Sequence, residues 1–221
     1  MAKHPALPYV VPFGLYLAFM AIHNLFALSA SWEYPLRVMV VSGSVLYFSR
    51  HLLSLRVTNF VGSLLLGVLV FLIWIAPDLI WPGYRGHWLF QNPVLAASAN
   101  ASSKTVRPDI YILTFRVLGS VILVPIIEEL FWRGWLMRYL IASDFLGVPL
   151  GTYAARSFWI SALLFASEHG PYWEVGLAAG ILYGWWMVHT KTLSDCILAH
   201  AVTNGFLAIH VLAGHKWQYW P

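Results

Sequence analysis

Residues 121–133 read Val121-Ile122-Leu123-Val124-Pro125-Ile126-Ile127-Glu128-Glu129-Leu130-Phe131-Trp132-Arg133, an apolar run that contains two adjacent acids. A charge in the hydrocarbon core of a bilayer costs about 3 kcal/mol or more, so acids there are seldom kept without a use. The run therefore predicts a membrane-spanning helix in which Glu128 and Glu129 serve a purpose inside the protein.

The composition of the whole chain agrees with a membrane protein. Hydrophobic residues make up 60% of its 221 positions and charged residues only 10%, whereas a soluble domain carries about 25% charged residues. Apolar runs near the length that crosses a bilayer, about 20 residues, lie at 9–29, 35–55, 60–81, 111–137, 157–172, 174–189 and 193–213. We therefore expect an all-α, polytopic transmembrane bundle of about seven or eight helices, forming a single domain over residues 1–221.

The charge pattern limits the partners and the orientation. The formal net charge of +4 includes no block of basic residues, so nucleic acid is not an expected partner. A narrow excess of Lys and Arg in alternate connections favours an amino terminus on the cytoplasmic side.

Cys196 is the only cysteine and lies in an apolar run, which is typical of a buried, inert thiol.

Three glycines at four-residue spacing, Gly176, Gly180 and Gly184, occupy one face of the helix expected at 174–189. In membranes, small residues at this spacing let a second helix backbone approach closely. We expect this helix to be held tightly by its neighbours.

Three polar segments reach a similar depth. At about 1.5 Å of rise per residue, Glu128, His169 and His200 each lie roughly 14–20 Å from the nearest basic residue at a helix end. His169 precedes Gly170-Pro171, which predicts the end of a helix inside the membrane, where irregular backbone is tolerated only within protein or beside water. The three segments are therefore expected to converge.

Residues four apart share a helix face. This spacing pairs Glu129 with Arg133 as a structural ion pair, and it points His200 and Asn204 in the same direction. Glu128 lies about 100° away around the helix and lacks a partner in its own turn. An unpaired, desolvated carboxylate suits a general base.

This set of side chains suits the attack of water on an amide. Glu128 is expected to take the proton from water, His169 to orient that water, and His200 with Asn204 to stabilise the oxyanion. No serine-nucleophile motif and no His-Glu-x-x-His zinc motif is present in the sequence.

The segments Glu128-Glu129-x-x-x-Arg133, Phe165-x-x-x-His169 and His200-x-x-x-Asn204 resemble the three motifs of the CAAX-protease and bacteriocin-processing family. This family of intramembrane proteases includes the Ras-converting CAAX endoprotease. The resemblance spans about 125–210, within a motif-bearing core expected at about 111–213, and implies a glutamate protease without a required cofactor. It implies Glu128, His169, His200 and Asn204 as catalytic residues, with Glu129 and Arg133 in support.

The short chain and its aromatic-rich ending also resemble the bacterial CAAX-protease-related proteins that accompany exosortase and PEP-CTERM sorting systems. This resemblance implies an integral protein of the bacterial inner membrane. Its partners would be membrane lipids and a protein or peptide substrate in the membrane.

Three other interpretations remain open at this stage. Glu128, His169 and His200 are also suited to a zinc site with open positions, as catalytic zinc requires. A non-catalytic immunity or scaffold protein would keep its activity after Glu128→Gln. A transporter would use the buried carboxylate as a proton site, but the sequence lacks the paired internal repeats that many transporters have.

Overall fold

The computed structural model describes residues 4–26, 29–90 and 109–220. The described residues form seven long helical segments without a strand, which confirms the all-α bundle. They are α1 (Leu7–Phe26), α2 (Ala30–Ser44) with a π-helical extension (Val45–Ser49), α3 (Phe60–Ile80), the continuous run of α5 (Ile110–Leu118), α6 (Val124–Glu129) and α7 (Met137–Tyr139), α8 (Ala155–Ser167), α9 (Trp173–Thr190) and α10 (Leu193–Gly214).

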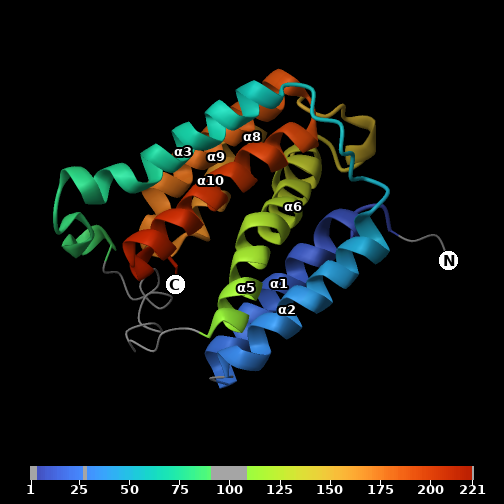
Figure 1. The fold of residues 1–221 in the computed structure, drawn as a ribbon. Coiled ribbons are helices and arrows are strands. Elements are labelled where there is room, and N and C mark those ends of the chain that lie inside the picture. Colours follow the sequence, from blue (N-terminus) through green and yellow to red (C-terminus); the bar gives the residue numbers. More distant parts are fainter. Residues whose placement is uncertain (1–3, 27–28, 91–108, 221) are drawn as a thin grey trace.

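The run from α5 to α7 is the central element of the bundle. It passes between two groups of helices, with α3, α8, α9 and α10 on one side and α1 and α2 on the other (Figure 1). Two π-helical stretches, Gly119–Leu123 and Leu130–Leu136, interrupt this run on either side of α6. Such bulges occur frequently at functional sites. They leave the short helix α6, which carries both acids, flanked by irregular turns.

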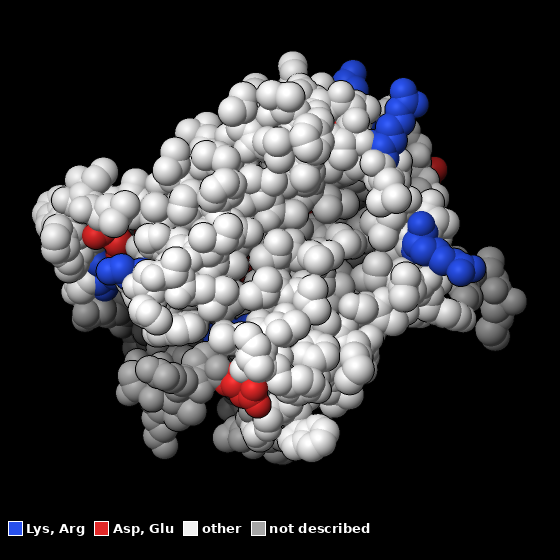
Figure 2. All heavy atoms as spheres, in the orientation of Figure 1, with Lys and Arg blue, Asp and Glu red and all other residues white. Residues whose placement is uncertain are grey.

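The surface of the bundle is largely apolar. Figure 2 shows a face on which the charged side chains lie toward the edges and a broad uncharged area separates them. Three described helical runs, Phe60–Ile80, Ile110–Tyr139 and Leu193–Gly214, are long and apolar enough to cross a membrane. The protein is therefore an integral membrane protein.

Helix α9 packs closely on α8 through its glycines, as the sequence predicted. A Cβ atom placed on Gly180 would lie 3.1 Å from the carbonyl oxygen of Ala162, and one on Gly184 would lie 3.0 Å from the Phe158 ring. A Cβ on Gly176 would lie 3.1 Å from the imidazole of His169. The glycine face thus brings α9 against α8 and against His169, which follows the end of α8.

Several helix boundaries differ from the expected ones, including the end of the run at 35–55, because the π-helical extension of α2 ends at Ser49. Helix α8 ends at Ser167 rather than near 172, because Gly170 has a φ of +51° and Pro171 cannot donate a helical hydrogen bond. Helix α2 begins at Ala30 rather than at 35, and its Pro35 lies near the helix start. The connection between the expected runs at 60–81 and 111–137 falls mainly on residues 91–108, which lie outside the described residues.

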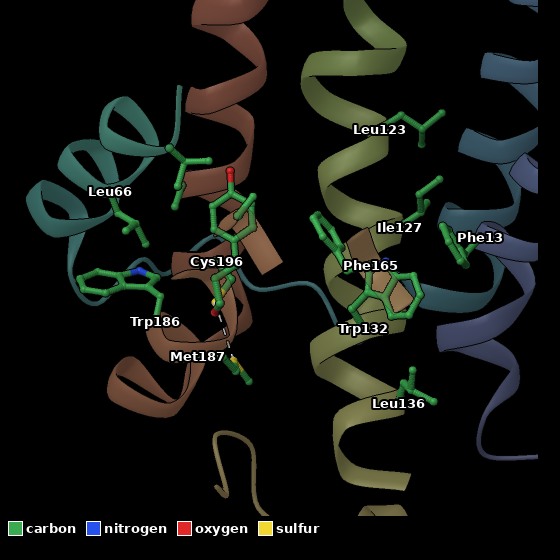
Figure 3. Close-up of a cluster of buried hydrophobic side chains, with 14 of the residues drawn as sticks. Phe13, Leu66, Leu123, Ile127, Trp132, Leu136, Phe165, Trp186, Met187 and Cys196 are labelled. Atoms are coloured by element: carbon green, nitrogen blue, oxygen red, sulfur yellow. Dashed lines mark hydrogen bonds between the residues drawn. The ribbon is translucent and has the colours of Figure 1, made fainter. Parts of the chain in front are cut away.

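The largest buried apolar cluster surrounds the central run. Ile127 and Trp132 of this run lie beside Phe165 of α8 and Phe13 of α1 (Figure 3). Cys196 is fully buried in the same cluster, with its sulfur 3.9 Å from that of Met187. Its position confirms the expected buried thiol.

Candidate active site

The second acid of the pair, Glu129, is the centre of a buried ionic network. Its Oε1 atom accepts from Nη1 of Arg133 at 3.1 Å and lies 3.0 Å from Nδ1 of His200 on α10. Arg133 also donates to the carbonyl oxygen of Gly180 at 3.2 Å. The expected pair between Glu129 and Arg133 is present, and it extends to the third motif.

Glu128 differs from its neighbour. The residue is 8% exposed, and its Oε2 atom is buried with no hydrogen-bond partner among the described residues. The carboxyl group lies within electrostatic range of Glu168, Glu129 and Arg133. The sequence expectation of an unpaired acid beside a paired one is thus found in the structure.

His169 lies immediately after the end of α8. Its Nδ1 atom lies 2.7 Å from the carbonyl oxygen of Phe165, so Nδ1 must carry the hydrogen of that bond. In the neutral imidazole, Nε2 is then an acceptor. The ring is further held at 5.2 Å from Trp74 and 4.7 Å from Phe165. This arrangement fixes a ring whose Nε2 can accept a hydrogen from water.

His200 is fixed by stacking as well as by Glu129. Its ring stacks on Tyr183 at a centroid distance of 5.0 Å and an interplanar angle of 23°. The Tyr183 hydroxyl donates to Thr203 at 2.7 Å, and Thr203 bonds the carbonyl oxygen of Gly67 at 2.8 Å. Since Nδ1 of His200 faces the carboxylate, Nε2 is the atom left for other contacts.

Asn204 satisfies a backbone group that a proline leaves unpaired. Its Nδ2 atom donates to the carbonyl oxygen of Ser120 at 2.8 Å. In this π-helical stretch the N–H of Val124 bonds Gly119, five residues earlier, so Pro125 is the residue opposite Ser120 and has no N–H to offer. Neighbouring helices often satisfy such freed groups in membranes. One Nδ2 hydrogen of Asn204 is therefore used in the bond to the Ser120 carbonyl oxygen. The second Nδ2 hydrogen is not used in that bond.

The three motifs meet around the Phe165 ring. Its centroid lies 4.7 Å from that of His169, 6.1 Å from that of His200 and 4.6 Å from Cζ of Arg133. The sequence expectation of convergence inside the bundle is therefore supported by the geometry. The sequence predicts that His200 and Asn204 point in the same direction. In the structure each has a structural partner: His200 contacts Glu129, and Asn204 donates to Ser120.

The zinc alternative needs a group of side chains that face one point. Within residues 4–26, 29–90 and 109–220, no three His, Cys, Asp or Glu side chains are arranged to hold a metal ion. Glu128, His169 and His200 are not such a group in this arrangement.

Two residues of the site were not identified from the sequence. Tyr183 follows the glycine face of α9 and supports the His200 ring. Glu168 directly follows the last residue of α8 and precedes His169. An acid beside the motif histidine was the available signal for Glu168, whereas nothing in the sequence distinguishes Tyr183 from other aromatic residues.

A comparison with protein-family models gives a match that spans all three motifs. Residues 111–206 match the model described as "Rce1-like: Type II CAAX prenyl endopeptidase Rce1-like". This part of the chain is therefore similar to type II CAAX prenyl endopeptidases. The match begins where the motif-bearing core was expected to begin, and the family is one of membrane endopeptidases. Searches of curated proteins and of solved structures found no match.

Proposed function

We propose that this CAAX-type endopeptidase crosses the bacterial inner membrane several times and hydrolyses a peptide bond at or within the membrane, in a protein or peptide substrate. The contrast between the adjacent acids carries the proposal. The Oε2 atom is buried without a partner in both acids, but Glu129 is neutralised by Arg133 and bonded to His200 through Oε1, whereas Glu128 has no ion pair or hydrogen bond with any described residue and its Oε2 stays unpartnered. Leaving such an atom unpaired costs about 1–3 kcal/mol, more if it is charged, so its retention indicates a use.

Glu128 and His169 form the water-activating half of the proposed mechanism. Glu128 accepts a proton from water, and the resulting hydroxide attacks the carbonyl carbon of the substrate. His169 orients this water through Nε2, because its Nδ1 is committed to the Phe165 carbonyl. The fixed imidazole lowers the entropy cost of placing the water.

His200 and Asn204 form the oxyanion half. Asn204 offers its second Nδ2 hydrogen, while the first holds Ser120. His200 is the second donor, through Nε2, because its Nδ1 is held by the Glu129 carboxylate. Removal of one oxyanion donor costs about 3 kcal/mol, or roughly a hundredfold or more in rate.

The decisive experiment compares Glu128→Gln with the wild-type protein. In membranes of cells that produce each form, the proteome's new termini are compared, and a substrate found this way is then cleaved by purified protein in ¹⁸O-water. We expect one ¹⁸O atom in the new carboxyl terminus with the wild type and no cleavage with Glu128→Gln. Identical fragment patterns would instead support a non-catalytic immunity or scaffold role.

A chelator distinguishes the metal-free mechanism from the zinc alternative. We expect phenanthroline to leave the cleavage rate unchanged and the purified protein to contain no stoichiometric zinc. Loss of activity that added zinc restores would favour the metal-dependent version. The non-chelating isomer of phenanthroline is the matched control, because it has the same apolar ring system.

A further inference from the structure

Arg138 is a buried cation without a counter-charge. It is the penultimate residue of the apolar helical run Ile110–Tyr139, and it is only 7% exposed. Its Nε and Nη2 atoms are buried without a hydrogen-bond partner, and no ion pair joins its guanidinium to any residue that the structure describes. Arginine is not deprotonated in proteins, so this charge needs an anion that the described contacts do not provide.

No acidic side chain of the chain supplies that anion. The sequence contains nine Asp and Glu residues, and all of them lie among the described residues: Glu33, Asp78, Asp109, Glu128, Glu129, Asp144, Glu168, Glu174 and Asp195. The ion pairs that these acids form in the described part of the chain are with Arg37, Arg85, Arg133 and His200. Asp144, the acid nearest to Arg138 in the sequence, is exposed. The counter-charge of Arg138 is therefore not one of these side chains.

Two aromatic rings hold the guanidinium in place. Its Cζ atom lies 5.0 Å from the ring centroid of Phe145 and 5.8 Å from that of Tyr9, and the two rings meet edge-on at 5.4 Å. Cation–π contacts of this kind offset only part of the cost of removing a charge from water, and they provide no acceptor for the N–H groups. The third nitrogen, Nη1, is not among the enclosed atoms, so an anion can approach the guanidinium from that side.

The position of Arg138 along its helix indicates the class of anion. The run Ile110–Tyr139 has 30 residues, which corresponds to about 45 Å at 1.5 Å per residue. This length equals the thickness of a bilayer with its headgroup regions, so Arg138 lies at headgroup level. Phosphate is the anionic group of phospholipids at that level, and the planar guanidinium binds phosphate through two parallel N–H···O bonds.

Other basic residues lie at the same end of the bundle. Arg156 is the second residue of α8, and the adjacent Ser157 donates to the carbonyl oxygen of Met137. Both Arg156 and Lys191, which follows the end of α9, are exposed. Figure 2 shows Lys and Arg side chains toward the upper right of the uncharged area, the end at which α6 continues into α7 (Figure 1). Basic groups beside the membrane attract anionic headgroups, but the exposed ones are already solvated, whereas Arg138 is not.

We propose that Arg138 binds a phosphate group at the headgroup level of the bilayer, with Tyr9 and Phe145 fixing the orientation of its guanidinium. The phosphate supplies the missing counter-charge and accepts from the unpaired nitrogens. It also fixes the depth of the helical run that carries Glu128, which lies about 15 Å away at 1.5 Å per residue. The inference does not depend on the proposed hydrolysis, because it concerns binding and stability alone.

The test follows thermal unfolding of lipid-depleted protein in a phosphate-free detergent. Added phosphatidylglycerol should raise the unfolding temperature of the wild type by several degrees. Diacylglycerol with the same chains should not, because it lacks the phosphate. Arg138→Gln should bind phosphatidylglycerol about tenfold or more weakly, as expected for lost hydrogen bonds to a charged group. Arg156→Gln is the matched control, since it removes one exposed positive charge from the same end, and its affinity should change by no more than about threefold.

Inorganic phosphate distinguishes a lipid headgroup from a free anion. A shift of the wild type with inorganic phosphate equal to that with the lipid, and absent in Arg138→Gln, would support the site with free phosphate as its ligand. Arg138→Lys keeps the charge without the planar fork, so its affinity should lie between those of the wild type and Arg138→Gln, and it replaces the latter if that variant does not fold. Equal lipid affinity of the wild type and the Arg138 variants, or an equal loss in Arg156→Gln, would overturn the inference.

Discussion

The Nδ1 atom of His200 and the Nη1 atom of Arg133 contact the same oxygen, Oε1 of Glu129, at 3.0 and 3.1 Å. This oxygen joins the first and third motifs across two helices that are far apart in the sequence. The carboxylate is fully buried, so both contacts form in a medium of low polarity. Glu129 therefore stabilises the contact between two helices as well as its own helical turn.

Glu129→Ala leaves Arg133 as a buried charge without its carboxylate. Breaking a buried ion pair by removing one partner costs about 3–5 kcal/mol, and we expect a loss of this size in the free energy of unfolding. The double variant Glu129→Ala/Arg133→Met should recover a large part of that loss. Denaturant unfolding in detergent measures the free energy of unfolding of both variants. If the double variant recovers none of the loss, the unpaired charge of Arg133 is not the main cause of the destabilisation.

Asn204→Ala should affect both stability and catalysis, for separable reasons. The Ser120 carbonyl loses its donor, which costs about 1–3 kcal/mol for a buried acceptor. The proposed oxyanion site loses a donor as well, which lowers kcat about 100-fold or more.

Pro125→Ala separates these two effects, because it returns a backbone N–H opposite Ser120. In the double variant Asn204→Ala/Pro125→Ala, we expect stability to recover while kcat stays low. Unfolding curves and peptide hydrolysis are measured on the same preparations. If kcat recovers together with stability, Asn204 acts only through the helix and not on the oxyanion.

The sequence predicted the helices and the pairing within each motif, because both follow from local spacing. The run of apolar residues from 111 to 137 and the interval from Glu129 to Arg133 give the span and the ion pair directly. The four-residue glycine spacing gave the contact of α9 with its neighbour. These features depend on residues within a few helical turns.

The contacts between motifs were not predictable in the same way. The bond between His200 and Glu129 joins residues 71 positions apart, and the bond between Asn204 and Ser120 joins residues 84 positions apart. The second depends on the π-helical stretch Gly119–Leu123 just before Pro125, which the apolar pattern does not reveal. The sequence therefore placed His200 and Asn204 on a common face without showing that each has a structural partner.

Gly180→Ala should destabilise the contact between α8 and α9. The new Cβ atom would lie 3.1 and 3.2 Å from the carbonyl oxygen and Cα atom of Ala162, which are backbone atoms and cannot rotate away. Overpacking of this kind costs about 1–3 kcal/mol. Thermal unfolding in detergent measures the effect.

Gly14→Ala is the matched control, since Gly14 lies inside α1 with no atom within 4 Å of the added Cβ. The substitution removes only the flexibility of glycine and should stabilise the protein by roughly 0.5–1 kcal/mol. Equal effects of the two substitutions would contradict the close approach of α8 and α9.

Arg85 ties the turn after His169 to two other elements. Its guanidinium lies 3.2 Å from Asp78 of α3 and 2.9 Å from Glu174 of α9, and its Cζ atom lies 3.8 Å from the Tyr172 ring centroid. Burial alone lowers the pKa of Arg85, but the bond and charge of Glu174 and the charge of Asp78 raise the pKa above its ordinary value. The cation therefore persists in this partly buried position.

Arg85→Ala should lower the free energy of unfolding by about 3 kcal/mol, the lower end for a broken buried pair, because the side chain keeps 16% exposure. Arg85→Lys should recover only part, since an ammonium lacks the planar fork that spans both carboxylates. Arg50→Ala, at an exposed position, should stay within about 0.5 kcal/mol of the wild type. Because Arg85 also donates to the carbonyl oxygen of Pro171, two residues after the motif histidine, kcat of Arg85→Ala should also fall with KM nearly unchanged. Full recovery by Lys would show that charge alone, and not the fork, holds this turn.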